Sequence, residues 1–159
     1  MVIMKTNNIT RLLDSKGIHY SVYELPAEKL GALETATLLN VHPEIVYKTI
    51  VVSRQGKGKP ILAVVPGISE VDLKLLAKVL NEKKLILPTE REAEKITGLQ
   101  AGGISPLALI NRGFEIIIDD SVNKHSEIHI SGGQRGMNIR LPVINLIEIL
   151  RAKVLRVCS

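Results

Sequence analysis

Two apolar segments joined by a short polar turn constrain the fold more than any other feature of the sequence. Residues 48–53 and 60–65 consist mostly of valine, isoleucine, leucine and alanine, and residues 54–59 between them hold two glycines. This pattern predicts a β-hairpin. Because neither strand alternates apolar with polar residues, we expect this part of the sheet to be covered on both faces.

The remaining elements are short and closely spaced. The apolar periodicity and the turn residues predict further strands at 18–25, 85–87, 115–119, 127–131 and 137–141, and helices at 8–16, 33–39, 69–80, 90–96 and 143–150. We expect Ser69 to cap the helix that it begins, with Val79 facing inward, and Thr89 and Gly98 to bound the helix at 90–96. Short connections favour antiparallel pairing, and we expect a mixed, largely antiparallel sheet that closes toward a barrel. The predicted fold class is α/β, mixed α and β with flanking helices, in one domain over residues 1–159.

The charge fits a polyanionic partner such as RNA but does not demand one. Lysine and arginine number 21 and aspartate and glutamate 16, a formal net charge of +5 scattered along the chain. Aromatic residues make up only 3% of the chain, which argues against a surface that stacks many bases on aromatic rings.

The lone cysteine, Cys158, excludes an intrachain disulfide and fits a reducing compartment. We expect residues 151–159 to form a loose tail, and a cysteine in such a tail with no histidine nearby in sequence is a poor nucleophile. No apolar stretch approaches membrane-spanning length, and the apolar run at the N-terminus is too short for a signal peptide. We expect a cytoplasmic protein with no membrane partner.

A glycine-rich loop, residues 102–106, is the first candidate for a chemical role. Gly102 and Gly103 let the main chain approach a ligand closely, and Pro106 restrains the backbone at Ser105. Such a loop can direct backbone N–H groups at a carbonyl or anionic oxygen. A plain turn between a helix and a strand explains the same residues.

Two further segments carry polar groups at strand ends. Lys48 opens the first apolar strand, beside Thr49, where a fixed positive charge could hold a phosphate or a carbonyl oxygen; a solvated lysine at a strand end is the alternative. Ser131, Gly132 and Gly133 follow the strand at 127–131, with Arg135 close behind, and could form an anion-binding nest. A glycine-rich hairpin turn is the alternative for this segment.

The histidines do not predict a metal site. In an extended strand His125 and His129 would lie about 13 Å apart, too far to share an ion. No Ser-His-Asp arrangement stands out, and the Asp119-Asp120 pair is equally explained as a strand end that enters a turn. We expect neither metal nor cofactor.

The Lys48-Thr49 pair, the Gly102–Pro106 loop and the Ser131–Gly136 segment, in this order, resemble the YbaK/EbsC family, which shares its fold with the editing domain of bacterial prolyl-tRNA synthetases. The resemblance implies that Lys48 is a key active-site residue. It also implies that the backbone of Gly102, Gly103, Ser105 and Pro106 surrounds the scissile carbonyl. Two positions depart from the family pattern: Ala108 replaces a glycine, and Gln134 stands where a basic residue is usual.

The resemblance implies a trans-editing aminoacyl-tRNA deacylase that hydrolyses the ester of a mischarged tRNA, with prolyl tRNA carrying Cys or Ala as the first candidates. It implies catalytic Lys48, Gly102, Gly103, Ser105 and Pro106, and substrate-binding Thr49, Ser131, Gly132, Gly133 and Arg135, to which we add Tyr23 as a substrate-binding candidate. Tyr23, Leu30 and Ile50 are guesses for the pocket wall, and plain core packing explains them as well.

The implied partner is the 3′ acceptor end of tRNA rather than DNA, and prolyl-tRNA synthetase is a further candidate partner. The two departures keep open a non-catalytic module of the same fold that binds tRNA or a synthetase. Hydrolysis of a different small ester or acyl-nucleotide in the same pocket is a third alternative.

Overall fold

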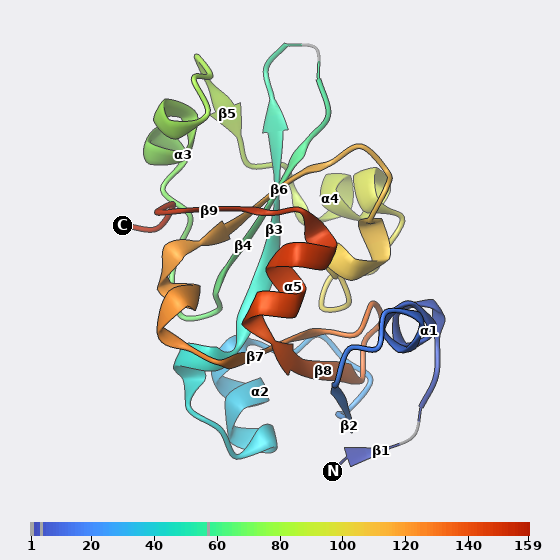
Figure 1. Cartoon of the computed structure of the whole chain (residues 1–159). Helices are drawn as coiled ribbons and strands as arrows, with labels where there is room; N and C mark the ends of the chain where they lie inside the picture. The colour runs from blue at the N-terminus through green and yellow to red at the C-terminus, as the bar shows by residue number, and fades with distance from the viewer. Residues whose placement is uncertain (1, 4, 57) are drawn as a thin grey trace.

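The larger of two β-sheets contains the predicted hairpin. In the computed structural model, which describes residues 2–3, 5–56 and 58–159, this sheet has the strand order β5-β3-β4-β6-β9 (Figure 1). Its strands are, in chain order, β3 (Tyr47–Arg54), β4 (Ile61–Pro66), β5 (Leu85–Ile86), β6 (Glu115–Asp119) and β9 (Lys153–Leu155). The β3–β4 and β3–β5 pairs are antiparallel, whereas β6 runs parallel to both β4 and β9.

The second sheet is antiparallel throughout, with the order β1-β2-β8-β7. Its strands are β1 (Val2–Ile3), β2 (Ser21–Glu24), β7 (Glu127–Ser131) and β8 (Met137–Pro142). The expected closure of one sheet toward a barrel is wrong. The strands divide between two sheets, and within the described residues an isolated bridge between Val46 and His129 connects them.

In the part of the chain that the structure describes, five α-helices and three 3₁₀ turns connect the strands. The helices are α1 (Asn8–Ser15), α2 (Ala32–Leu39), α3 (Leu73–Val79), α4 (Glu90–Thr97) and α5 (Val143–Leu150), and the turns are η1 (Pro43–Ile45), η2 (Pro106–Leu109) and η3 (Asp120–Lys124). None of the helices in the described part of the chain is long and apolar enough to span a bilayer.

Helix α3 is shorter than the sequence predicts. The expected N-cap was Ser69, but the side chain of Asp72 caps the helix by accepting a hydrogen bond from the N–H of Leu75. The preceding residues are extended, since Val71 forms a bridge with Cys158. Val79, expected to face inward, is 41% exposed.

The larger sheet separates two hydrophobic cores, as its uniformly apolar strands predict. On one face Leu62, Val64 and Ile118 pack with the inner face of the second sheet, with α1 and with α5. On the other face Ile61, Ala63 and Ile117 pack with α3 and with the C-terminal residues. Every residue of β4 is buried, which explains why the sequence shows no alternation there.

The C-terminal tail is built into the fold through Asp119. The Oδ1 atom of this carboxylate accepts hydrogen bonds from the N–H groups of Val157, at 3.0 Å, and Cys158, at 3.2 Å. Val157 and Cys158 are both buried. The sequence did not predict β9 or this anchorage, and the view of residues 151–159 as a loose tail is wrong.

Candidate active site

A cavity of about 470 Å³ lies where the three predicted motifs meet. Lys48 and Thr49 on β3, Gly102 in the glycine loop and Ser131 at the end of β7 all line it. The loop that precedes α2, the segment that precedes α4 and the start of β8 complete the walls. Segments more than 80 residues apart in sequence therefore contribute polar groups to one space.

Lys48 is the second residue of β3, and its charge is only weakly neutralised. Its side chain is 30% exposed, and its Nζ lies 3.6 Å from a carboxylate oxygen of Glu70, whose own side chain is 90% exposed. An ion pair with so exposed a partner is weak. The ammonium group therefore stays available to a ligand in the cavity.

The glycine loop packs closely on the turn after β7. A Cβ atom on Gly103 would lie within 2.9 Å of the backbone of Gln134 and Arg135. The Nε of Arg135 donates a hydrogen bond to the carbonyl of Ala101 at 2.6 Å. Gly102 adopts φ +88°, a conformation that L side chains rarely take. Two of the predicted motifs thus fix each other's position.

The hydrogen bonds of the loop show which of its donors are free. The N–H of Gly103 is already bonded to the carbonyl of Gln100 at 2.8 Å, and the N–H of Ala101 to Glu94 at 2.7 Å. Among the hydrogen bonds of the described residues, none engages the N–H of Gly102 or of Ile104, and both residues line the cavity.

Ser105 and Pro106, at the end of the loop, are not part of the cavity wall. Both are buried, and the Ser105 Oγ accepts a hydrogen bond from the N–H of Leu107 at 3.3 Å. This bond caps η2, which Pro106 opens. These two residues set the backbone conformation of the loop and do not line the cavity.

The second glycine motif contributes two wall residues, Ser131 and Gly136. The Oγ of Ser131 accepts a hydrogen bond from the N–H of Gly133 at 3.2 Å. Gly132 packs against Met137, and Gly133 packs against Ile9 of α1. The structure therefore brings Ser131 to the cavity, whereas neither of these glycines lines it.

Tyr23 lies outside the cavity lining, whereas the other two guessed wall residues, Leu30 and Ile50, belong to it. The Tyr23 ring packs against His129, with ring centroids 5.3 Å apart, and against the guanidinium of Arg140.

Asn138 is a lining residue that the sequence reasoning missed. It is 5% exposed, and its Oδ1 lies 2.7 Å from the Nδ1 of His129, which is completely buried. With the amide oxygen facing the ring, Nδ1 carries the proton and Nε2 is a bare acceptor, with no partner among the described residues. Burial lowers the pKa of His129, and the charge of Arg140 lowers it further, so the ring is neutral at pH 7.

The register between β7 and β8 would have indicated that Asn138 belongs to the site. Asn138 pairs directly with Ser131 across β7 and β8, and paired residues point to the same face of a sheet. A polar residue opposite Ser131 therefore shares its surroundings. The sequence shows both strands, but it does not give the register that makes this inference possible.

Tyr47, next to Lys48, contributes a neutral polar group. Burial raises the pKa of Tyr47 to about 12, and its hydroxyl lies 2.7 Å from the Oγ of Ser121. The phenol is therefore protonated at neutral pH and does not act as a base.

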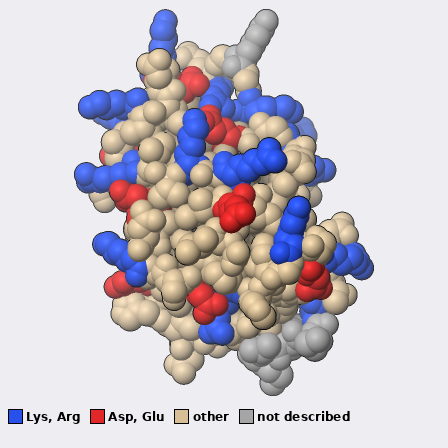
Figure 2. All heavy atoms as spheres, viewed as in Figure 1, with Lys and Arg blue, Asp and Glu red and all other residues tan. Residues whose placement is uncertain are grey.

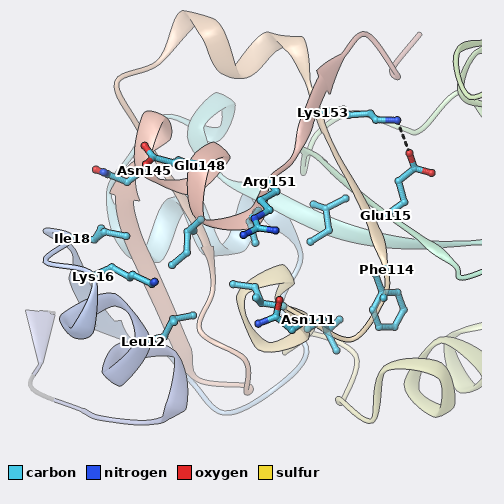
Figure 3. A pocket seen from close by; sticks show the side chains of 16 residues that line it. Leu12, Lys16, Ile18, Asn111, Phe114, Glu115, Asn145, Glu148, Arg151 and Lys153 are labelled. Atoms are coloured by element: carbon cyan, nitrogen blue, oxygen red, sulfur yellow. Dashed lines mark hydrogen bonds and ion pairs between the residues drawn. The ribbon is translucent and has the colours of Figure 1, made fainter.

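A second cavity, of about 640 Å³, lies elsewhere in the molecule, between α1, the segment before β6 and α5 (Figure 3). None of the predicted site residues lines it. Figure 3 shows Lys16 and Arg151 directed into it, with the Lys153–Glu115 ion pair at one side.

Comparison with known proteins gives a family match and a curated relative. A family model described as the aminoacyl-tRNA editing domain matches residues 27–149. The chain is 32% identical over 136 residues to the Enterococcus faecalis protein EbsC, whose assignment as a Cys-tRNA(Pro)/Cys-tRNA(Cys) deacylase is provisional. The alignment covers 84% of this chain and 82% of EbsC.

Two solved structures share the fold. The hypothetical protein APE2540 superposes with a TM-score of 0.87 at 20% identity, over 96% of this chain and 100% of the other. A protein provisionally assigned as a trans-editing enzyme for prolyl-tRNA synthetase superposes with a TM-score of 0.82 at 22% identity, over 98% and 99% of the two chains. The matched region contains all three motifs that line or support the cavity, and the chain belongs to the aminoacyl-tRNA editing domain family.

Proposed function

We propose that this protein is a trans-editing deacylase, which hydrolyses the ester between a wrong amino acid and the terminal ribose of a tRNA. Prolyl tRNA carrying Cys or Ala is the first candidate substrate. The convergence of Lys48, the two unengaged N–H groups of the glycine loop and Asn138 on one cavity carries the proposal. These are the groups that ester hydrolysis without a protein nucleophile needs.

The loop acts on the carbonyl oxygen of the ester. A water molecule or a group of the substrate itself attacks the carbonyl carbon, and negative charge develops on the oxygen. The N–H groups of Gly102 and Ile104 donate to that oxygen from fixed positions, which stabilises the tetrahedral intermediate. When water attacks, collapse of the intermediate breaks the bond to the ribose oxygen, which takes up the proton that the water gives up, and releases the free amino acid and the tRNA. When a side-chain group of the amino acid attacks, the same bond breaks, the amino acid leaves as a cyclic ester or thioester, and water then opens the ring to the free acid.

Lys48 and Asn138 orient the substrate. The ammonium group of Lys48 contacts the terminal phosphate or the aminoacyl group. Because His129 holds the amide oxygen of Asn138, the amide nitrogen remains to donate to the substrate. Thr49 and Ser131 add hydroxyl groups, while Ser105, Pro106, Gly103 and Arg135 hold the loop in place.

Selection of the amino acid follows from the size of the space. The apolar part of the wall includes Leu30, Ile50 and Ile104. A side chain that is too large is excluded by contact, although one methylene group alone changes the rate only about 10- to 200-fold.

Deacylation of a panel of mischarged prolyl tRNAs, with Cys and Ala first, tests the proposal. We expect rapid turnover by the wild type and a loss of about 100-fold or more in Lys48→Ala, as for removal of one group that stabilises the transition state. Lys16→Ala, an exposed lysine at the second cavity, is the matched control and should retain full activity.

Three outcomes would change the proposal. Absence of turnover with tRNA still bound would contradict the deacylase and favour a binding module. Turnover unaffected by Lys48→Ala would retain the enzyme and remove the role of Lys48. Turnover of other small acyl esters that uncharged tRNA does not inhibit would indicate a different substrate.

A further inference from the structure

Four exposed lysines gather where α3 leads into β5. Lys74 and Lys78 lie one turn apart on α3, and Lys83 and Lys84 immediately precede β5. We call these four residues the basic ridge. Figure 2 shows lysine and arginine side chains projecting around this upper left end of the molecule.

The charges of the basic ridge are not neutralised within the described part of the chain. No ion pair there involves any of the four lysines. Glu82, their neighbour in sequence, is bonded to Arg54 at 2.8 Å. Like charges spaced four residues apart on a helix are destabilising. Repulsion between Lys74 and Lys78 therefore lowers the local stability of α3.

The other borders of the active-site cavity are less favourable to an anion. Helix α2 carries Glu34 and no basic residue. The first turn of helix α4 carries two glutamates and one arginine, Arg91, and Lys29 on the neighbouring loop is paired with Glu90. A polyanion that reaches the cavity therefore meets attractive charge on the side of β5.

Strand β5 connects the basic ridge to the cavity. Leu87 and Pro88, which directly follow β5, line the cavity, so Lys84 lies about 10 Å from its border at ~3.3 Å per residue. Arg54 pairs with Leu85, which puts Lys84 about 23 Å from Lys48 along the sheet. A single-stranded end of several nucleotides spans this distance.

The surface between the two is apolar and open. Ile86 and Leu87 are 44% and 57% exposed, and β5 is the edge strand of its sheet. Exposed aliphatic side chains beside a row of cations fit the ribose and base faces of a nucleic acid strand, whose phosphates the cations contact.

We propose that the basic ridge binds the acceptor arm of tRNA through its phosphates, and that the 3′ strand runs along β5 into the active-site cavity. The inference rests on the proposed function, because it assigns the approach of that substrate. The contacts are to the backbone, so they contribute affinity without selecting the tRNA sequence.

Binding of uncharged tRNA at several salt concentrations tests the basic ridge directly. Lys83→Gln/Lys84→Gln is compared with Arg11→Gln/Lys16→Gln, which removes the same charge from α1 at the opposite end of the molecule (Figure 1). We expect the Lys83/Lys84 variant to bind about tenfold more weakly near 0.1 M salt, with the slope of log K against log salt reduced by about 1.4 to 2. The α1 variant should match the wild type.

Deacylation separates this inference from the proposed function. On mischarged tRNA the Lys83/Lys84 variant should show a raised KM with kcat unchanged, and on a terminal aminoacyl-adenosine it should equal the wild type. Another outcome is that the wild type hydrolyses neither substrate while its tRNA binding still depends on the two lysines. That result would contradict the proposed function and support tRNA binding by the basic ridge.

Three results would contradict the proposal that the basic ridge binds tRNA. The first is equal tRNA affinity in both double variants. The second is no measurable tRNA binding by the wild type. The third is binding to vesicles of anionic phospholipid that depends on Lys83 and Lys84 while tRNA binding does not, which would assign the charge to a lipid surface.

Discussion

His129 connects the core of the second sheet to the wall of the active-site cavity. The ring is completely buried, packs on Tyr23 and holds Asn138 through Nδ1. Glu127 and Arg140 lie on the same face of the sheet and influence its charge state. A neutral histidine here fixes the direction of an amide that a water-filled site would leave free to rotate.

Replacing this ring tests its role in stability. His129→Phe keeps an aromatic ring beside Tyr23 but leaves the buried Oδ1 of Asn138 unsatisfied, so we expect the free energy of unfolding at pH 7 to fall by about 1–3 kcal/mol. Urea denaturation measures this. His19→Asn, at an exposed position, should be neutral.

The same variant tests the pH dependence. The folded-state pKa of His129 lies below its unfolded value near 6.5, so the unfolded chain binds the proton first as pH falls. Stability should therefore be full above about pH 7 and decline below about pH 6.5, by at most about 1.4 kcal/mol per pH unit. His129→Phe should lack this decline, and its persistence in the variant would contradict the assignment.

Single residues differ in how far the sequence predicts them. Lys48 and Gly102 were predicted to share a site and do line one cavity, because each stands at the end of a recognisable strand or helix. Asn138 and His129 were missed as site residues, since their roles depend on the register between β7 and β8. Ser105 and Pro106 were placed in the correct loop, but their burial depends on packing that no local pattern shows.

At the level of elements, the glycine loop depends on close backbone contact. An alanine Cβ at position 103 would meet backbone atoms of Gln134 and Arg135 at 2.8–2.9 Å, and backbone cannot rotate away as a side chain can. At Gly98, which ends α4 with φ +73°, the same Cβ would meet nothing within 4 Å.

The two glycines therefore make a matched pair. We expect Gly98→Ala to cost about 1–2 kcal/mol, the strain of a left-handed residue, with deacylation unchanged. Gly103→Ala should cost more, by about 1–3 kcal/mol of steric conflict, and should also lower kcat by moving the loop. Equal effects of the two substitutions on stability and activity would show that the contact with residues 134–135 is easily relieved.

The tail gives a second prediction for an element. Burial raises the pKa of the Cys158 thiol to about 12, and the charge of Asp119 adds to this. Asp119→Ala removes the acceptor of the Val157 and Cys158 N–H groups, so the tail should detach. The rate of Cys158 modification by a disulfide reagent at pH 8 should then rise at least tenfold, whereas Asp120→Ala, next to it and exposed, should leave the rate unchanged.

Acid should act on the tail in the same way. Although burial opposes it, hydrogen bonds from Ser121 and from the N–H of Val157 hold the pKa of Asp119 below its usual range. The stabilisation by this carboxylate is present above its unfolded pKa near 3.9 and is lost as pH falls through the lower folded value. Thiol exposure in the wild type should therefore begin below pH 4.

The boundaries of helices were predictable where the sequence offers a single capping residue at each end. Thr89 caps α4 and Gly98 ends it, as predicted. Ser69 and Asp72 are both good capping residues, and the pairing of Val71 with Cys158 decides between them. That partner lies 87 positions away, so no local pattern could have predicted the later start of α3.

For the whole molecule, the larger sheet is shared by both cores. Ile117 and Ile118 are adjacent on β6, completely buried, and face opposite cores. The uniform burial of the central strands was predictable from composition alone. The division into two sheets was not, because it depends on which strands pair across long stretches of chain.

A pair of substitutions tests whether the two cores unfold together. Ile117→Ala and Ile118→Ala should each lower the free energy of unfolding by about 2–5 kcal/mol. Circular dichroism and tyrosine fluorescence should still report one coincident transition in both variants. A separate early transition in Ile117→Ala alone would show that α3 and the tail form an independent unit.

The pairing of β2 with β8 also determines when, during synthesis of the chain, the second sheet can form. These strands are separated by about 110 residues, and at 5–20 residues per second a ribosome needs about 5–20 s to make the intervening chain. During that interval β2 has no partner on its inner edge, and the wall of the cavity that β8 supplies does not exist. The second sheet and the cavity are therefore completed together, late in synthesis, when β8 has been made.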